Sequence, residues 1–402
     1  MHIAYITSEF ATEKARGGLA TYLNNITSIM EEHGHKVTVI TLSERTGRIQ
    51  YDKNIEVVRV KAAAVSNADE VMHALSLIHN SWNLYRILKR ENKRCRIDVV
   101  QAANYQAVGF FRDLSIPTIV RVSSDASLWR NAMQYKFSYE EAIQEKTLSD
   151  YLELYCAKWA DAVFAPSRFC ADAVQKRTKR NVTVIESPYL YKQQKLDESL
   201  YNEKLLNKKY LLFNSTLSRL KGTHIGIEAT EALLEKYPDL YMVYAGYDYG
   251  FSQKEGGIQK IREILAKQHK RYNGRVIYLG RLEHNTLFSL IKHALACVLP
   301  SRVDNLPNSC IEAMALESIV IGTYGASFEQ LIKNKENGLL IKRDSAVSLT
   351  KAVDWIMDLS EKERLEMGKK AHAAVYRLRP EKVYYELSLF YEKVIENFKK
   401  KA

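Results

Sequence analysis

Short apolar runs, polar loops and amphipathic segments alternate along the chain. Residues 3–7 and 37–42 are apolar runs of strand length that are rich in β-formers. Between them, Leu19, Leu23 and Ile26 recur at the spacing of one helix face. A strand, a helix and a second strand in this order form a βαβ unit. The pattern therefore predicts an α/β protein with parallel strands.

The same alternation continues to the C-terminus. Further strands are expected at 55–60, 98–102, 118–122, 162–167, 182–185, 210–213, 241–245, 276–279, 294–299, 319–321 and 339–341. Helices are expected at 78–88, 139–159, 287–293, 310–316 and 383–398, and one more is expected to begin at about residue 222. The segment 139–159 has the pattern of one long helix.

A charged and polar stretch at 189–208 has no clear period, which predicts a linker between two domains. We expect a first domain at 1–195 and a second at 205–380, with a C-terminal segment at 381–402. The chain has 402 residues, of which 46% are hydrophobic, enough for two cores.

The stretch 299–332 reads LPSRVDNLPNSCIEAMALESIVIGTYGASFEQLI and joins an apolar strand to a helix through a polar loop. Asp304 lies in the loop, and Glu312 lies in the first helical turn. Asn308 and Ser309 are good N-cap residues, and the free N–H groups behind them suit a diphosphate. An ionised Glu312 accepts hydrogen bonds from two ribose hydroxyls, while Asp304 points at the hydroxyls of an attached sugar. Alternatively, both acids simply decorate a helix N-terminus.

An acid, seven residues, a second acid, Ala-Met-Ala, a β-rich run and the Gly325–Glu329 spacing follow one another here. This order resembles the signature of the retaining family 4 glycosyltransferases. The family usually has Glu at the position of Asp304, and Gly and Pro at the positions of Glu317 and Ile319.

The resemblance implies the GT-B fold: an α/β protein with two Rossmann-like domains facing across a cleft and a C-terminal helix that crosses back to the N-terminal domain. It implies transfer of a sugar from a UDP- or GDP-linked donor to a hydroxyl acceptor, with retention at the anomeric carbon. The N-terminal domain would hold the acceptor and the C-terminal domain the nucleotide sugar.

The resemblance also implies a set of donor-side residues. Asp304 and Lys221 are expected to be catalytic, together with Arg219, which takes the place of an arginine that the family usually has at the position of Thr216. Charge-assisted hydrogen bonds from these cations suit a diphosphate, although a surface loop with two cations is the alternative. The expected donor-binding residues are Glu312, Asn305, Leu306, Pro307, Asn308, Ser309, Arg281, Leu282 and Gly18.

The acceptor side departs from the family pattern. A histidine that the family often has is replaced by Ser123, so no catalytic histidine carries over. Acceptor contacts are expected from Asn104, Ser123, Ser124 and Asp125. The missing base fits a mechanism in which the departing phosphate oxygen takes the acceptor proton.

Composition narrows the partners. The net charge of +12 and the pI of about 9.2 favour anionic partners. The run KRENKRCR at 89–96 is either a solvated helix end or a surface for anionic lipid headgroups. The resemblance to the family, and not the composition, implies that the acceptor is a carbohydrate or a lipid-linked molecule, in polysaccharide or glycoconjugate biosynthesis. No nucleic-acid partner is expected, because aromatic residues do not interleave with the basic run.

Other features concern the compartment and cofactors. The chain has five widely spaced cysteines and no apolar run of 18 residues, which favours the cytoplasm. If the basic run 89–96 contacts lipid headgroups, the protein would also associate with the cytoplasmic face of a membrane. It has no Asp-x-Asp pair, so we expect no essential metal and no cofactor. Two alternatives remain: a nucleotide-sugar epimerase of the same architecture, and a non-catalytic nucleotide or nucleic-acid binder.

Overall fold

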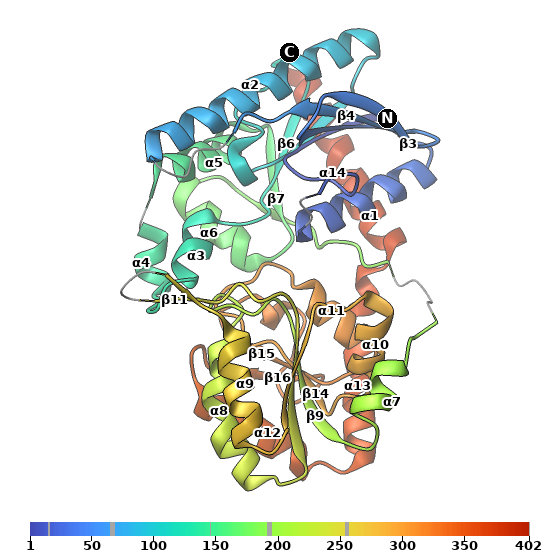
Figure 1. Cartoon of the computed structure of the whole chain (residues 1–402). Coiled ribbons are helices and arrows are strands. Elements are labelled where there is room, and N and C mark those ends of the chain that lie inside the picture. Colours follow the sequence, from blue (N-terminus) through green and yellow to red (C-terminus); the bar gives the residue numbers. More distant parts are fainter. Residues whose placement is uncertain (15–16, 65–68, 145, 191–194, 254–256, 402) are drawn as a thin grey trace. The chain divides into compact units, whose positions relative to one another are not determined.

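A computed structural model describes residues 1–14, 17–64, 69–144, 146–190, 195–253 and 257–401. The chain folds into two compact units (Figure 1). Unit 1 consists of Met1–Ser127, Glu140–Leu190 and Leu378–Ala402, and unit 2 consists of Leu128–Tyr139 and Tyr191–Arg377. The segment Leu128–Tyr139, which the sequence placed in the first domain, therefore packs with unit 2. Residues 191–194 of the expected linker lie outside the described residues.

Unit 1 contains an eight-stranded sheet in the order β3-β4-β2-β1-β5-β6-β7-β8. The strands are β1 (His2–Thr7), β2 (Lys36–Ser43), β3 (Gly47–Asp52), β4 (Ile55–Lys61), β5 (Val99–Ala103), β6 (Thr118–Arg121), β7 (Ala162–Ala165) and β8 (Thr183–Val184). All pairings are parallel except that of β3 with β4. The edge strand β3 was not predicted, because its residues are mostly exposed and polar.

The helices of unit 1 are α1 (Gly18–Glu32), α2 (Glu70–Arg94), α4 (Tyr139–Gln144), α5 (Leu148–Trp159), α6 (Arg168–Thr178) and α14 (Pro380–Lys401). A further helix, α3 (Ala126–Ala132), runs from unit 1 into unit 2. The C-terminal helix α14 packs in unit 1, where Tyr391 donates a hydrogen bond from its hydroxyl to the Gln101 side chain at 2.5 Å.

The prediction of one helix at 139–159 is wrong. Two helices, α4 and α5, cover this segment, and residue 145 between them lies outside the described residues. Thr147 caps the second helix: its side chain accepts from the Asp150 N–H, while the Asp150 carboxylate accepts from the Thr147 N–H. This reciprocal capping box starts a new helix at Leu148.

Unit 2 contains a six-stranded parallel sheet in the order β13-β10-β9-β14-β15-β16. Its strands are β9 (Lys209–Asn214), β10 (Leu240–Ala245), β13 (Val276–Gly280), β14 (Ala296–Val298), β15 (Val320–Thr323) and β16 (Leu339–Ile341), and a hairpin is formed by β11 (Phe251–Ser252) and β12 (Ile258–Gln259). Its helices are α7 (Ser199–Lys204), α8 (Thr223–Lys236), α9 (Ile261–Arg271), α10 (His284–His293), α11 (Asn308–Ala315), α12 (Ala346–Asp358) and α13 (Glu361–Val375).

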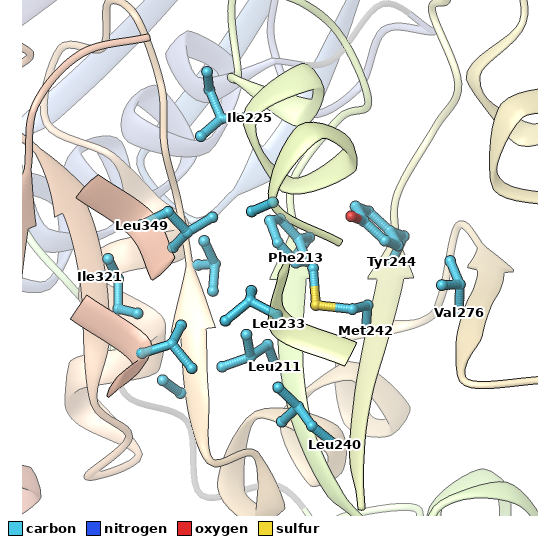
Figure 2. Packing of buried hydrophobic residues seen from close by; sticks show 14 of the residues in the cluster. Leu211, Phe213, Ile225, Leu233, Leu240, Met242, Tyr244, Val276, Ile321 and Leu349 are labelled. Atoms are coloured by element: carbon cyan, nitrogen blue, oxygen red, sulfur yellow. The ribbon is translucent and has the colours of Figure 1, made fainter. Parts of the chain in front are cut away.

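Helices cover both faces of the unit 2 sheet, with α8, α9 and α12 on one side and α10, α11 and α13 on the other (Figure 1). Alternate residues of the central strands point into the first of these layers. Figure 2 shows Leu211 and Phe213 of β9 beside Met242 and Tyr244 of β10, facing Leu233 of α8. These side chains are fully or almost fully buried, so the sheet is a rigid base for the loops at its carboxyl edge.

Candidate functional site

The loops that carry the predicted donor residues leave the middle of the unit 2 sheet. Strands β9 and β14 are neighbours there, and the chain proceeds from β9 to β10 and β13 in one direction and from β14 to β15 and β16 in the other. This reversal is a topological switch point, where open α/β sheets bind ligands beyond the carboxyl ends of their strands. The loop after β9 carries Arg219 and Lys221, and the loop after β14 carries Asp304.

A glycine brings the two loops together. Gly222 has φ +70°, and a Cβ at this position would lie 1.8 Å from the carbonyl oxygen of Pro300. The backbone N–H of Arg302 donates to the carbonyl oxygen of Leu220 at 2.8 Å. Only glycine combines this left-handed conformation with so close an approach. The backbone therefore holds Lys221 beside the loop that contains Asp304.

The side chains of Lys221 and Asp304 form an ion pair. The Lys221 Nζ lies 2.6 Å from Asp304 Oδ2. The same carboxylate accepts from the Ser301 hydroxyl at 3.1 Å and from the Asn305 backbone N–H at 3.1 Å. The structure thus brings together two of the three predicted catalytic residues. The Lys221 ammonium retains further hydrogens to donate, because it has three.

Arg219 is held by aromatic rings. Its guanidinium carbon lies 4.8 Å from the ring centre of Tyr135 and 4.7 Å from that of Phe251. Its buried Nε has no hydrogen-bond partner among the described residues. Burial, and then the nearby charge of Arg302, lower the pKa of Arg219. An arginine in this state remains charged and has donors left for an anion.

The N-cap of α11, the helix after the Asp304 loop, lies one residue before the first of the two expected N-cap residues, Asn308. Pro307 is the N-cap of α11, and no side chain caps this helix. The prediction that Asn308 and Ser309 act as N-caps is therefore wrong: the Pro307 carbonyl accepts from Cys310 and Ile311 N–H at 3.0 and 3.2 Å, which puts Asn308 in the first turn.

The N–H groups of Asn308 and Ser309 remain available in that turn. They have no acceptor within the part of the chain that the structure describes. Both residues are half-buried, whereas Leu306 and Pro307 are buried. The Ser327 hydroxyl donates to the Asn305 carbonyl and ties the loop after β15 to this turn. Unpaired N–H groups and the positive end of the helix dipole favour an anion at this place.

Glu312 lies one turn into α11. Burial raises the pKa of its carboxyl group to about 7. Neither carboxylate oxygen accepts a hydrogen bond from any residue that the structure describes. A half-buried acid without donors is well suited to accept hydrogen bonds from a ligand, because a ligand hydroxyl would supply what the protein does not.

Sequence reasoning missed Arg302, which is 3% exposed. Its Nε donates to Asp344 Oδ1 at 2.7 Å, and its Nη1 donates to the Gln134 carbonyl at 2.6 Å and to the Ala132 carbonyl at 3.2 Å. Arg302 therefore holds the segment Leu128–Tyr139, including Tyr135, in unit 2. The sequence held one signal for this residue: a positively charged side chain soon after the apolar run at 294–299, where the loop of the site begins.

Asp344 and His224 were also missed. His224 Nε2 lies 3.0 Å from Asp344 Oδ1, the oxygen that Arg302 also contacts. Burial by itself raises the pKa of Asp344, but the hydrogen bonds from His224 and Arg302 lower it overall. The carboxylate thus contacts both side chains and fixes their positions. Nothing local in the sequence linked these three positions.

The predicted base-contact residues follow β13. Arg281 is exposed and Leu282 is half-buried. The carbonyl of Gly280 accepts from Gly246 N–H at 2.8 Å, which brings the loop after β10 alongside. That loop carries Tyr247 and Tyr249, whose exposed rings lie 4.9 Å apart. The two tyrosines add an aromatic surface that the sequence reasoning did not consider, and the base contact stays a prediction.

In unit 1, Gly18 is the first residue of α1 and Gly17 is its N-cap. The Gly17 N–H donates to the Glu9 carboxylate at 2.6 Å. Burial raises the pKa of Glu9. The glycine loop therefore opens a helix as predicted, but one of its N–H groups is already paired. Its expected contact with a donor diphosphate stays a prediction.

The four predicted acceptor residues lie together at the carboxyl ends of β5 and β6. The Asn104 side chain accepts from the Ser123 N–H at 2.7 Å and donates to the Ser124 carbonyl at 2.8 Å, so it joins the two loops. Asp125 is buried and pairs with Arg177 at 3.0 Å. Ser123 and Ser124 are half-buried. Asn104 and Asp125 are thus buried residues that support the loops at this edge of the sheet. Ser123 and Ser124 are the two of the four that are partly exposed.

The described ranges contain neither a metal centre nor a membrane span. No group of three or more His, Cys, Asp or Glu side chains there could hold a metal ion. No helix among these residues is long and apolar enough to cross a membrane. The five cysteines are free thiols, four of them buried.

Comparison with known families covers both halves of the chain. The model described as glycosyl transferases group 1 matches residues 198–374. The model described as glycosyltransferase family 4 matches residues 16–188. The chain belongs to the family 4 glycosyltransferases. This glycosyltransferase carries the acid-x7-acid signature of residues 304–312 within the first of these matches.

Two curated relatives align over most of the chain. An uncharacterised glycosyltransferase of Methanocaldococcus jannaschii is 24% identical over 89% of this chain and 89% of its own length. Spore coat protein SA of Bacillus subtilis is 21% identical over 92% of this chain and 93% of its own. The relatives do not favour the epimerase alternative.

Solved structures confirm the predicted fold. Sucrose-phosphate synthase from Thermosynechococcus elongatus superposes with a TM-score of 0.76 at 17% identity, covering 99% of this chain and 100% of the other. HepE from Anabaena in complex with UDP-glucose superposes with a TM-score of 0.70 at 15% identity, covering 98% and 100%. The glycosyltransferase has the GT-B architecture of two Rossmann-like units.

Proposed function

We propose that this glycosyltransferase moves a sugar from a nucleoside-diphosphate sugar to a hydroxyl of a carbohydrate or lipid-linked acceptor, with retention at the anomeric carbon. The observation that carries the proposal is the meeting of Lys221 and Asp304 at the switch point of the unit 2 sheet. A cation for a diphosphate and an acid for sugar hydroxyls stand there side by side. A neighbour of the same fold is a complex with UDP-glucose, which supports a UDP-linked donor.

In this proposal, each of these residues contacts one part of the donor. Lys221, Arg219 and the free N–H groups of Asn308 and Ser309 bind the diphosphate, and Glu312 accepts from the ribose hydroxyls. Asp304 accepts from hydroxyls of the transferred sugar, and Arg281 and Leu282 contact the base. The cations stabilise the charge that develops on the departing diphosphate, usually a large term in such catalysis.

The bond changes follow from retention. The acceptor hydroxyl oxygen forms a bond to the anomeric carbon on the face from which the phosphate oxygen departs. The bond between the anomeric carbon and that oxygen breaks, and its electron pair stays with the nucleoside diphosphate. A phosphate oxygen takes the proton of the acceptor hydroxyl. The protein thus needs no base of its own at the acceptor, and Ser123 stands where the family often has histidine.

We further propose that the reaction needs no metal, and that it serves polysaccharide or glycoconjugate synthesis. Cations and helix N–H groups can take the place of a divalent ion against the diphosphate. Calorimetric titration with UDP, GDP, ADP and CMP in the presence of EDTA tests donor site and metal together. Binding of one diphosphate in the micromolar range, lost in Glu312→Ala, is the expected result. Failure of every nucleotide to bind would contradict the proposal.

Stereochemistry has a separate test. The nucleotide that binds identifies the sugar donors to screen, and proton NMR of the early product reports the configuration at the anomeric carbon. Product with the donor's configuration supports retention. Inversion would overturn the proposed mechanism while leaving the donor site intact.

A further inference from the structure

The proposed donor site includes a contact from a segment that interrupts unit 1. The segment Leu128–Tyr139 packs in unit 2, although the chain on both sides of it belongs to unit 1. The ring centre of Tyr135, in this segment, lies 4.8 Å from the guanidinium carbon of Arg219. A short stretch that follows the predicted acceptor residues therefore contacts an arginine on the donor side.

Arg219 is oriented by aromatic rings rather than by an acid. The ring centre of Phe251 lies 4.7 Å from its guanidinium carbon, so both this ring and that of Tyr135 are within cation–π distance. Asp304, in the adjoining loop, pairs with Lys221 instead. The buried Nε of Arg219 has no hydrogen-bond partner in the ranges that the structure describes. The direction in which this guanidinium presents its N–H groups therefore depends on the two rings.

The two rings are held in different ways. Phe251 belongs to β11, is 6% exposed and is part of the unit 2 core. Tyr135 is 51% exposed, and its backbone carbonyl accepts from Arg302 at 3.3 Å. Phe251 is thus fixed by the core, whereas the Tyr135 ring stays on Arg219 only while its segment is docked.

A second contact docks the same segment. The guanidinium carbon of Arg343 lies 5.3 Å from the ring centre of Phe137, two residues after Tyr135. The Arg343 Nε donates to the carbonyl of Arg302 at 2.9 Å, so the two arginines that hold the segment are themselves joined. The position of Tyr135 therefore depends on contacts made on both sides of it in the chain.

We propose that Tyr135 is a positioning residue of the donor site. A ring packs over the face of a guanidinium and leaves the edge, where the N–H groups point, to an anion. The Tyr135 ring thus fixes Arg219 without competing with the phosphate oxygens. Because such coupling is reciprocal, a bound diphosphate also stabilises the docked segment Leu128–Tyr139. This inference rests on the proposed function, in which Arg219 binds the diphosphate.

The same coupling reaches the predicted acceptor edge through the chain. Asp125 pairs with Arg177 at 3.0 Å and accepts from the Ser127 hydroxyl at 2.9 Å. The segment begins at the next residue, Leu128. A diphosphate that stabilises the docked segment therefore also restricts the loop that leads into it from the predicted acceptor residues.

The first test is calorimetry with UDP, GDP and ADP on the full-length protein. Tyr135→Ala should weaken binding of the diphosphate that the wild type binds by about three- to tenfold, and Tyr135→Phe, which keeps the ring, should stay within about twofold of the wild type. In an Arg219→Ala background, Tyr135→Ala should cause no further loss, because the ring acts through Arg219.

The matched control for calorimetry is Tyr241→Ala. The Tyr241 ring also contacts a cation, since the Lys208 Nζ lies 4.9 Å from its centre. Tyr241 is the second residue of β10, at the amino end of the strand, whereas the loops of the site leave the carboxyl ends. This variant should retain the nucleotide affinity of the wild type.

The second test is protection from trypsin, which a ring with only a structural role would not change. The segment contains Arg130 and Lys136. In the wild type, a saturating diphosphate should slow cleavage at these two sites by at least about threefold, because the ligand stabilises the docked segment. In Tyr135→Ala the protection should be absent, even at a concentration that saturates the variant. Protection that persists there would mean that the nucleotide covers the segment directly, and would contradict the role of Tyr135.

The outcomes separate this inference from the proposed function. Tyr135 is half exposed, so its replacement by alanine should leave the protein folded. If the wild type binds a diphosphate and Tyr135→Ala binds it equally well, Tyr135 is not a positioning residue and the donor site stands. A loss in Tyr135→Ala that is the same with and without Arg219 overturns the inference in the same way. If the wild type binds none of the three diphosphates, the proposed function fails and this inference fails with it.

Discussion

The Nζ of Lys221 lies 2.6 Å from Asp304 Oδ2, although 83 residues separate the two in the chain. The pair is mostly buried, with 24% of the Lys221 side chain and 12% of the Asp304 side chain exposed. A donor diphosphate would have to share the ammonium with this carboxylate. In the proposed function, Lys221 binds the diphosphate and Asp304 binds the transferred sugar. Variants of the two residues should therefore affect different properties, nucleotide affinity for Lys221 and the rate of sugar transfer for Asp304.

Lys221→Ala should weaken binding of the nucleoside diphosphate by about 1.5–3 kcal/mol, because it removes a charge-assisted hydrogen bond to phosphate. That loss corresponds to roughly 10- to 150-fold in affinity by calorimetry. Asp304→Asn should keep nucleotide affinity within a few-fold while lowering the rate of sugar transfer. The control is Lys236→Ala, an exposed cation of the same unit that pairs with Asp354. Equal losses in Lys221→Ala and Lys236→Ala would contradict the assignment of Lys221.

Nucleotide binding should depend on the ionisation of Glu312. Burial raises the pKa of this group to about 7, so the carboxyl is largely protonated at pH 6 and largely ionised at pH 8. An ionised acid accepts hydrogen bonds from both ribose hydroxyls and binds them more strongly. Affinity for the diphosphate should therefore rise with pH through about 7.

Glu312→Gln separates this effect from ionisation of the nucleotide phosphate. The amide does not titrate, so the variant should retain only the pH dependence that belongs to the nucleotide. The comparison is calorimetry of both proteins across this pH range. If the two affinity curves stay parallel, Glu312 is not the group that titrates.

The same carboxyl should cost stability at neutral pH. Its pKa is 4.5 when unperturbed and about 7 in the folded protein, so between these values the folded chain binds more protons than the unfolded chain. The slope of unfolding free energy with pH is then negative for this group, and its stability contribution falls until about pH 7. The gain in stability of Glu312→Gln over the wild type should therefore grow between pH 4.5 and 7, by about 1–3 kcal/mol. Urea unfolding at several pH values measures it, and a gain that shrinks over this interval would contradict the burial argument.

Gly222→Ala should disrupt the donor site more than the fold. The new Cβ would lie 1.8 Å from the Pro300 carbonyl oxygen, and φ of +70° disfavours any L side chain. The loops after β9 and β14 would have to separate, which moves Lys221 away from Asp304. Nucleotide affinity should fall at least tenfold. Gly34→Ala is the control, because Gly34 also has positive φ but a Cβ there would meet no atom within 4 Å, so affinity should be retained.

Much of this site follows from local sequence, and the rest depends on distant contacts. The strands, the Gly222 helix start and the pairing of an acid loop with a cation loop are visible as apolar runs that end in polar turns. The break before Leu148 was also visible, since Thr147 and Asp150 have capping-box spacing. The long helix was predicted there because apolar periodicity runs through the break.

Other features had no local signal. The edge strand β3 is mostly polar and is defined by its pairing with β4. The two loops of the acceptor edge are joined by Asn104, whose partners lie 19 and 20 residues away. Arg302 binds backbone carbonyls near residue 134, almost 170 residues before it. Every residue type carries a backbone carbonyl, so no sequence pattern marks the carbonyls that accept these hydrogen bonds.

Arg302 supplies the last prediction. Its guanidinium donates to Asp344 and to the carbonyls of Ala132, Gln134 and Tyr135, and the residue is 3% exposed. Arg302→Ala leaves these acceptors and a carboxylate without their donor, which should destabilise the protein by about 3–5 kcal/mol. Arg302→Lys keeps the charge but loses the planar fork, so its loss should be smaller, about 1–3 kcal/mol.

Proteolysis distinguishes this anchoring role from a general loss of stability. The anchored segment contains Arg130 and Lys136, so trypsin should cut there earlier in both Arg302 variants than in the wild type under native conditions. Arg271→Ala is the control, because the exposed pair of Arg271 with Glu231 should be worth less than about 1 kcal/mol. If trypsin cuts the Arg302 and Arg271 variants at the same sites and rates, Arg302 does not hold the segment Leu128–Tyr139. Early cleavage confined to the Arg302 variants would also predict weaker nucleotide binding, because Tyr135 would no longer be held against Arg219.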